Sequence, residues 1–372
     1  MNFELSKPQQ LLRETTRASL AKACSKERVR ELMATDTAFD PKLWQTVTDQ
    51  GWVALHLPEE VGGLGLGLVE LAIVAEETGR ACLPGPMLPT LWASTMLAHL
   101  NKPALTSACL SPIVEGKPKA TVALLEPETG WDPGEVQLPL EKSNRGWQLN
   151  GRKTFVLDAA VADLILCVVR QGQELAIVAL PRGIPGLTIS ATPALDATRK
   201  LYDLTFNQVV IADTKVLAAG HQALSALQYA AQVAALAVCA ESVGAMQWAL
   251  EAAVEYAKTR QQFGKPIGSY QAVQNQCADM LLYTESARAT TLFAAWALTA
   301  GQAEAGKAVS VAKACCSDMG HEVCNRGVQV HGGIGFTWEH DLHLYLKRVA
   351  LGEALFGDAS YHREQIARLI LD

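Results

Sequence analysis

The stretch YAKTRQQFGKPIGSYQ, from Tyr256 to Gln271, ends one long helical pattern and precedes another. The alanine-rich pattern from Ser225 to Arg260 predicts a single helix of about ten turns. It breaks at Phe263 and Gly264 and resumes after a proline. An arginine at such a break can bond the last helix carbonyls or reach a ligand. The break therefore predicts long helices joined by a short turn, with Arg260 at the junction.

Three further helical patterns follow the break. They cover about 270–300, about 303–330 and the C-terminal stretch SYHREQIARLIL. Consecutive helices with short connections pack as antiparallel neighbours. The sequence therefore predicts a C-terminal four-helix bundle that begins near Thr214.

The middle of the chain, from about Ala120 to Ala212, has a different pattern. Short apolar runs such as LILCVV and ELAIVAL alternate with turn residues. Asn150 and Gly151 lie between two alternating stretches, which predicts a β-hairpin at that dipeptide. Because no helix-length segment separates the strands, we expect an antiparallel, barrel-like β domain.

The first hundred residues are helical in pattern from Lys7 to about Leu100. A glycine-rich run, GGLGLG, interrupts them, but it is not embedded in a strand-loop-helix unit. A flexible connection between helices is therefore favoured over a dinucleotide-binding loop. The whole chain is expected to be an α+β protein, with a helical domain at 1–117, a β domain at 118–213 and a helical bundle at 214–372.

Composition limits the classes of function. The 372 residues are 49% apolar and 19% charged, which is typical of a globular chain with two or three structural units. The net charge of -6 and the absence of basic runs argue against nucleic-acid binding. The nine cysteines form no C-x-x-C pair, so buried thiols are expected rather than a metal site or disulfides. The N-terminus lacks a signal pattern and the most apolar run contains Gln232, so we expect a cytoplasmic protein outside the membrane.

The predicted long helix carries one acid away from its polar stripe. That stripe consists of Gln247, Glu251, Glu255 and Lys258. Glu241 instead lines up with Val238, Ala245 and Trp248 on the apolar face. Removal from water makes a carboxylate a stronger base, so Glu241 could accept a proton from a carbon acid. From spacing alone, a structural acid paired with a base on a neighbouring helix is the favoured alternative.

Two motifs near the C-terminus resemble the acyl-CoA dehydrogenase family. They are YAKTRQQFGKPIGSYQAVQNQCADM and GVQVHGGIGFTWEHDLHLYLKR. GWVALHLPEEVGGLGLGLVELAIVAEETGRA resembles the N-terminal helical region of that family, and FNQVVIADTKVL resembles the end of its middle domain. The resemblance covers nearly the whole chain and agrees with the α-β-α order.

The resemblance implies a flavoprotein that binds FAD between subunits. In this family a carboxylate removes the α-proton of an acyl-CoA thioester while flavin N5 takes hydride from the β-carbon. The product is a trans-2-enoyl-CoA, and electron-transfer flavoprotein normally takes the electrons. The α-proton is only weakly acidic, so the chemistry needs both enolate stabilisation and a desolvated base.

Residues of the two motifs carry over to the FAD site by position. Arg260 and Phe263 would contact the pyrophosphate and adenine half of an FAD held mainly by a neighbouring subunit, with Gln271 near the same dinucleotide. Gln329, Gly332 and Gly333 would let FAD approach the backbone, since glycine has no Cβ.

The sequence departs from the family where the flavin ring should bind. In the family, a Thr-Glu-Pro-Gly-x-Gly-Ser-Asp segment carries hydroxyls that contact the flavin ring. The segment here reads LLEPETGWDP, and Leu125 and Trp131 stand where the family has those hydroxyl-bearing residues. Its Trp-Ile-Thr segment is replaced by residues 155–157, with the sequence FVL. Several direct bonds to the isoalloxazine ring are therefore expected to be absent.

The catalytic base also departs from the common pattern. Many members carry a Tyr-Glu-Gly-Thr segment, which here reads LFGD, so that Phe356 replaces the glutamate. Other members place the base on the long central helix, which makes Glu241 the leading candidate. Glu353 is the second candidate and Asp358 the third.

These losses resemble a branch that acts on bulky CoA thioesters, notably steroid side chains, as α2β2 assemblies of homologous chains. The chain is therefore expected to pair with a homologous subunit or with itself. Two alternatives remain: a partner chain that clamps FAD without catalysing a reaction, and a flavin oxidase that reduces oxygen directly.

Overall fold

The structure is a computed structural model that describes residues 4–371; residues 1–3 and 372 lie outside it. The chain divides into two compact units. Unit 1 contains Met1–Arg30, Gly67–Leu83 and Ala235–Asp372, and unit 2 contains Glu31–Leu66 and Pro84–Ala234. The division falls inside α8 (Gly220–Thr259), which is the predicted long helix. The predicted domain boundaries after residues 117 and 213 stay predictions.

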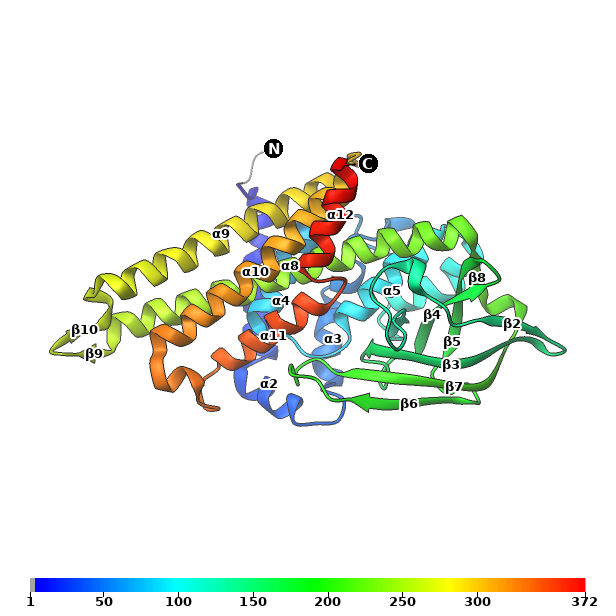
Figure 1. Cartoon of the computed structure of the whole chain (residues 1–372), viewed down its shortest axis with the longest axis horizontal. Coiled ribbons are helices and arrows are strands. Elements are labelled where there is room, and N and C mark those ends of the chain that lie inside the picture. Colours follow the sequence, from blue (N-terminus) through cyan, green and yellow to red (C-terminus); the bar gives the residue numbers. More distant parts are fainter. Residues whose placement is uncertain (1–3, 372) are drawn as a thin grey trace. The chain divides into compact units, whose positions relative to one another are not determined.

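Unit 1 is helical. Helix α10 packs against α9, α11 and α12, while α4 packs against α1 and α9 (Figure 1). The helices that lie in or begin in this unit are α1 (Lys7–Ala23), α2 (Lys26–Met33), α4 (Leu68–Ala81), α9 (Gln271–Thr299), α10 (Ala305–His331), α11 (Leu342–Ala354) and α12 (Ala359–Leu371), with the 3-10 turns η6 (Ile267–Ser269) and η7 (Gly332–Phe336). Helices α9, α10 and α12 match the predicted ones closely, whereas α11 was not separately predicted.

Local sequence explains where the first helices begin. Ser6 caps α1: its hydroxyl accepts the Gln9 backbone N–H, and the Gln9 side chain accepts the Ser6 backbone N–H. Asp40 caps α3 (Pro41–Asp49) in unit 2, with its carboxylate accepting the Lys42 N–H at 2.8 Å. Both helices carry proline in the first turn, where no intrahelical N–H bond is lost.

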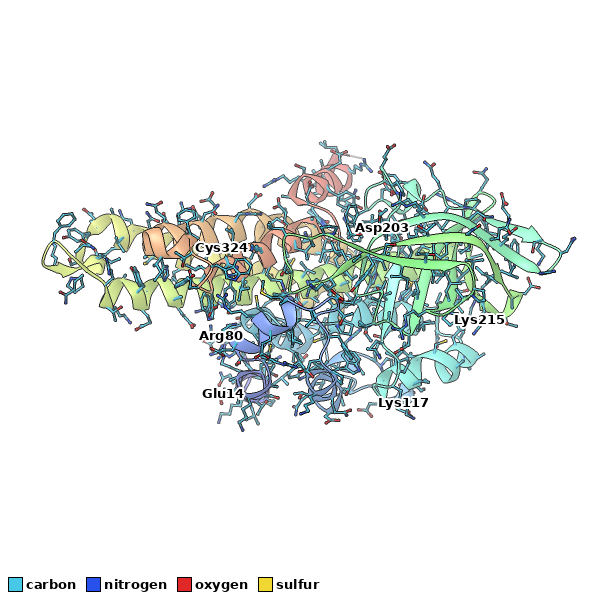
Figure 2. All side chains as sticks on the ribbon, turned by 90° about the horizontal axis from the view of Figure 1, so that it is seen from below. Glu14, Arg80, Lys117, Asp203, Lys215 and Cys324 are labelled. Carbon is cyan, nitrogen blue, oxygen red and sulfur yellow. The ribbon has the colours of Figure 1, made fainter. Side chains whose placement is uncertain are left out.

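Unit 2 contains two four-stranded sheets that share one apolar core. One sheet has the order β1-β4-β5-β8 and the other β2-β3-β7-β6. Asp203 of the second sheet, labelled in Figure 2, accepts a bond from Arg152 of the neighbouring strand at 2.8 Å. The strands are β1 (Ala120–Ala123), β2 (Leu140–Ser143), β3 (Gly146–Leu157), β4 (Leu164–Gln171), β5 (Glu174–Pro181), β6 (Leu187–Thr192), β7 (Leu201–Ile211) and β8 (Val216–Ala219).

Helices and helical turns before and between the strands complete unit 2. They are η1 (Trp52–Ala54), η2 (Glu59–Val61), α5 (Met87–Leu100), α6 (Pro103–Leu105), η3 (Thr106–Leu110), α7 (Ser111–Val114), η4 (Pro133–Glu135) and η5 (Asp213–Lys215). The glycine-rich run after η2 is a hydrogen-bonded connection: Gly65 N–H donates to Leu57 O at 2.9 Å. A Cβ at Gly63 would lie 2.1 Å from Leu57 O, so close packing demands glycine there.

Two details of the β domain differ from expectation. The predicted hairpin at Asn150 and Gly151 is wrong: β3 runs through them with a bulge, and Asn150 Oδ1 accepts the Gln208 N–H at 2.7 Å. The β2–β3 turn lies earlier, at residues 144–145, and β3 begins after it at Gly146, whose φ is +115°. The pair β1–β4 is parallel, because the β2–β3 hairpin supplies the long crossover that a parallel pair needs.

The apolar character of α8 is that of a core helix. By length and composition α8 could cross a membrane, but 67% of its most apolar stretch is buried inside the fold. All nine cysteines are thiols. Within residues 4–371, no three His, Cys, Asp or Glu side chains gather as a metal site would require.

Candidate functional site

Glu241 lies on α8 where this helix crosses α4 within unit 1, and only 7% of the residue is exposed. Backbone approaches backbone at this crossing. A Cβ built on Gly79 of α4 would lie 2.0 Å from Glu241 O, and one on Gly244 would lie 1.8 Å from Glu76 O. Glycine at both positions therefore sets the position of the Glu241 backbone.

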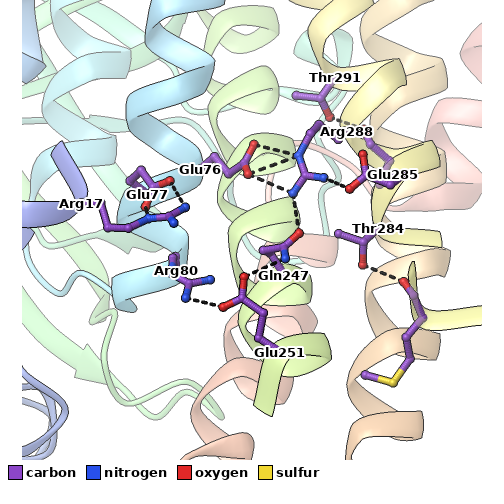
Figure 3. Close-up of polar contacts among 12 residues, drawn as sticks. Arg17, Glu76, Glu77, Arg80, Gln247, Glu251, Thr284, Glu285, Arg288 and Thr291 are labelled. Atoms are coloured by element: carbon purple, nitrogen blue, oxygen red, sulfur yellow. Dashed lines mark hydrogen bonds and ion pairs between the residues drawn. The ribbon is translucent and has the colours of Figure 1, made fainter. Parts of the chain in front are cut away.

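Ion pairs hold the same two helices further along the crossing (Figure 3). Arg80 of α4 donates to Glu251 of α8 at 2.5 Å, and Gln247 donates to the same carboxylate at 2.8 Å. Burial opposes ionisation of Glu251, but these bonds outweigh burial and lower its pKa. Arg288 of α9 joins Glu76 at 3.0 Å and Gln247 at 2.8 Å. The predicted polar stripe thus contributes two residues to an interhelical network.

Glu353, the second candidate base, lies on α11 beside α8. A Cβ on the preceding Gly352 would lie 3.3 Å from Ser242 Oγ, so α11 packs against α8 one residue from Glu241. The Glu353 carboxylate pairs with His321 Nε2 of α10 at 2.5 Å, and both side chains are 34% exposed. Glu353 is therefore engaged by a histidine and is more exposed than Glu241.

The loop from Leu355 to Asp358, where many family members place the base, is closed in this chain. Phe356 is buried, and its carbonyl lies 3.0 Å from His362 Nε2. Lys313 of α10 is also buried and donates to Glu353 O at 2.9 Å and Gly357 O at 2.7 Å. Burial lowers the pKa of His362 to about 4, with the nearby lysine acting in the same direction.

Asp358, the third candidate, directly precedes α12. Its carboxylate accepts the Tyr361 N–H at 2.7 Å, and its carbonyl accepts the His362 N–H at 3.1 Å. This is the geometry of a helix N-cap, so Asp358 has a structural role that does not require catalysis.

The break after α8 is a two-residue hairpin. Strands β9 (Gln261–Gln262) and β10 (Lys265–Pro266) pair across Phe263 and Gly264, whose φ values are +53° and +80°. Positive φ at both positions is the signature of a type I′ turn. The turn leaves Phe263 91% exposed, and Arg260 is exposed beside it.

The second dinucleotide motif lies at the end of α10. The Tyr256 ring on α8 stacks on the His331 ring at 4.6 Å, which brings the ends of α8 and α10 together within unit 1. Gln329, Gly332 and Gly333 are exposed next to this contact. Gln271 is exposed at the N-terminus of α9.

The two glycines have different local explanations. Gly332 has φ +61° and ψ -139°, a backbone conformation that other residues rarely adopt. Gly333 has no positive φ, and a Cβ there would meet nothing within 4 Å in the part of the chain that the structure describes. Neither packing nor backbone conformation of this chain requires glycine at Gly333. The residue thus fits the close approach of a bound molecule.

The segment that corresponds to the family's flavin-ring contacts makes hydrogen bonds within unit 2. The Glu126 carboxylate accepts bonds from Lys153 Nζ at 2.6 Å and from the Gln137 and Leu138 N–H groups at 2.9 Å. Leu125 is buried, and the Trp131 ring lies 6.2 Å from that of Trp92. The residues at the hydroxyl positions therefore offer no hydroxyl to a flavin ring.

Comparison with known families agrees with this architecture. The acyl-CoA dehydrogenase N-terminal, middle and C-terminal domain descriptions match residues 6–117, 121–209 and 224–371. The chain belongs to the acyl-CoA dehydrogenase family. This assignment confirms the predicted α+β fold, the enzyme class acting on the CH–CH bond of acyl-CoA and FAD as the cofactor of the family.

Individual relatives support the resemblance to the steroid branch. Acyl-CoA dehydrogenase IpdE2 of Mycolicibacterium smegmatis is 31% identical over 366 residues, which are 98% of each protein. The Tcur3481-Tcur3483 steroid ACAD is 29% identical, with a TM-score of 0.88 over 98% of both chains. The ChsE4-ChsE5 complex of Mycobacterium tuberculosis has a chain that is 28% identical, with a TM-score of 0.89 over 100% of this chain and 99% of that one.

Sequence reasoning missed the side chains that close the loop at Phe356. Lys313 shares a helical face with the buried residues Val309, Cys316 and Gly320. A lysine on such an apolar face could have been predicted to be buried and hydrogen-bonded. His362 had no such signal, because it bonds the Phe356 carbonyl across the turn before α12 and Ser310 on the distant α10, and neither contact follows from helical spacing.

Proposed function

We propose that this chain carries out the FAD-dependent α,β-dehydrogenation of an acyl-CoA thioester with a bulky acyl group, such as a steroid side chain, in the cytoplasm. The family match and the relationship to a steroid ACAD support this assignment. The product would be a trans-2-enoyl-CoA, and electron-transfer flavoprotein would receive the electrons.

Glu241 is the proposed catalytic base. The observation that carries this choice is the contrast between two positions: Glu241 is a buried acid on α8, whereas the common base position holds the buried Phe356. The Glu241 carboxylate would accept the proton as the Cα–H bond breaks. The Gly79 contact would keep it in place as the charge changes.

FAD, when bound, would accept the hydride that leaves the β-carbon. The residues that would hold its adenine and pyrophosphate half are Arg260, Phe263, Gln271, Gln329, Gly332 and Gly333. Arg260 would supply charge and donors for the pyrophosphate, and the N-terminus of α9 at Gln271 adds a favourable dipole. Exposed Phe263 and the open backbone at Gly333 fit contact with a molecule that a neighbouring chain holds.

Glu241→Gln tests the base directly. Enoyl-CoA formation should fall by roughly 10²- to 10⁴-fold, with bound FAD per chain unchanged. Glu353→Gln is the matched control, since it removes a carboxylate that pairs with His321, and it should retain most of the activity. If only Glu353→Gln lost activity, Glu353 rather than Glu241 would be the catalytic base.

A second candidate function is a partner chain that clamps FAD in an assembly with a homologous subunit. The structural bonds of Glu126 and the lack of hydroxyls at Leu125 and Trp131 favour it. Co-purification tests this possibility, with FAD per chain measured with and without a homologous chain. Full FAD binding and activity in the isolated chain would exclude it, and unchanged activity of Glu241→Gln in the complex would support it.

A further inference from the structure

A cleft of about 230 Å³ opens on unit 1 at the C-terminal end of α4. Its charged lining consists of Arg17 from α1, Lys26 from α2, and Glu77 and Arg80 from α4. Trp248 of α8 and Leu20 of α1 supply apolar surface. Three cations thus face one carboxylate in a space that the proposed FAD and base residues do not line.

The arginines are only partly satisfied by acids. Arg17 uses Nε and Nη2 to bind Glu77 at 2.9 and 2.7 Å (Figure 3). Arg80, labelled in Figures 2 and 3, uses Nη2 to bind Glu251, which lies outside the cleft lining. Its Nη1 is buried and has no hydrogen-bond partner among the described residues. A buried donor without a partner is unfavourable, so an acceptor that reaches Nη1 would be stabilising.

Lys26 donates hydrogen bonds to neutral carbonyls, while the charge of Asp341 acts on it without a direct bond. Its Nζ donates to Arg80 O and Ala81 O at 3.1 Å each and lies 4.8 Å from the Tyr345 ring centroid and 5.8 Å from that of Trp248. Burial lowers the pKa of Lys26, because the charged ammonium loses contact with water. An acceptor of opposite charge would offset that loss.

We propose that this cleft binds a small organic carboxylate, with its charge at Lys26 and Arg80 and its apolar body against Trp248 and Leu20. The excess of cations selects an anion, and a carboxylate accepts bonds from both cations. The volume is below that of sites for drug-sized ligands, so a small anion is enough to fill the cleft. This site is independent of the proposed dehydrogenation.

Calorimetric titration of the purified FAD-loaded protein with benzoate and with inorganic phosphate tests the proposal. Benzoate should bind saturably and more tightly than phosphate. Lys26→Met should weaken benzoate binding about tenfold, the loss expected for one charged hydrogen bond. Lys22→Met is the matched control, because Lys22 is exposed on α1 outside the cleft, and it should leave affinity unchanged.

Two further variants keep the test decisive if Lys26→Met does not fold. Lys26→Arg should retain affinity within a few-fold, and Trp248→Leu should weaken benzoate but not phosphate. The proposal is overturned by no saturable benzoate heat, by phosphate binding as tight as benzoate, or by benzoate binding indifferent to Lys26→Met or Trp248→Leu. Equal weakening in Lys22→Met would also overturn it, since general surface charge would then explain the binding.

Discussion

The Glu126 segment of unit 2 and the Gly333 segment of unit 1 both align with flavin-binding motifs, yet they are built in opposite ways. Glu126 is buried, and its carboxylate accepts hydrogen bonds from Lys153 and two backbone N–H groups. Gly333 is exposed, and among residues 4–371 nothing beyond its chain neighbours lies within 4 Å of a Cβ built there. A segment whose polar groups are satisfied internally contributes to stability, whereas an open segment is available to another molecule. Substitutions at the two kinds of position should therefore have different effects.

The largest effect on stability is expected at Lys153, which is fully buried. Lys153→Met leaves the Glu126 carboxylate buried without its cation. The free energy of unfolding should fall by about 3–5 kcal/mol. Urea unfolding of the variant measures this change.

The double variant Lys153→Met/Glu126→Gln is the control. It removes both charges, so much of the lost stability should return. If the single and double variants are equally unstable, the lysine acts through packing, and the buried ion pair does not explain the closed segment.

Acid should weaken a second closed segment, the loop at Phe356. The pKa of His362 is about 4 in the folded chain and ordinarily 6.5, so protonation favours the unfolded chain. The free energy of unfolding that depends on neutral His362 is fully present above pH 6.5. It should fall by roughly 3 kcal/mol as the pH falls toward 4. His362→Gln should reduce the difference in unfolding free energy between pH 7 and pH 4. An identical pH dependence in wild type and variant would contradict this account.

The long elements were predictable because local spacing determines them. Helix α9 (Gln271–Thr299) begins and ends within about one residue of the predicted bounds, since tertiary contacts only reinforce its pattern. The hairpin at Asn150 was mispredicted, because the Asn150 side chain bonds to Gln208, a residue remote in sequence.

The site was predictable to a similar degree. Burial of Glu241 followed from its place on the apolar face of α8, and the exposed turn at Phe263 followed from the dipeptide with glycine. The contact between Glu241 and Gly79 could not be derived, because nothing in either segment specifies which helix crosses the other. Long-range partners of buried polar groups, such as Lys313 with Gly357, were missed for the same reason.

Gly79→Ala should have a smaller effect on stability than the loss of a buried cation. The new methyl group would collide with Glu241 O, so α4 and α8 must separate slightly. Overpacking of this kind destabilises by about 1–3 kcal/mol. Thermal unfolding measures the change, and activity should fall as well if Glu241 is the base. Full stability together with full activity would show that the crossing has no role in positioning Glu241.

Gly333→Ala should have the smallest effect on stability and the clearest effect on binding. The added methyl group meets nothing within 4 Å, so the free energy of unfolding should stay within about 0.5 kcal/mol. If FAD approaches the backbone here, its affinity should fall about tenfold, measured by flavin fluorescence during titration of the deflavinated protein.

Gly183→Ala is the matched control for that experiment. Gly183 is equally exposed and its Cβ would also meet nothing, but it lies outside both dinucleotide motifs. It should alter neither stability nor FAD affinity. Because neither substitution disturbs packing, a difference between them in FAD affinity can arise only from contact with the cofactor or with the chain that holds it. Equal affinities would mean that the open backbone at Gly333 does not receive FAD, and the contrast with Glu126 would then be one of exposure alone.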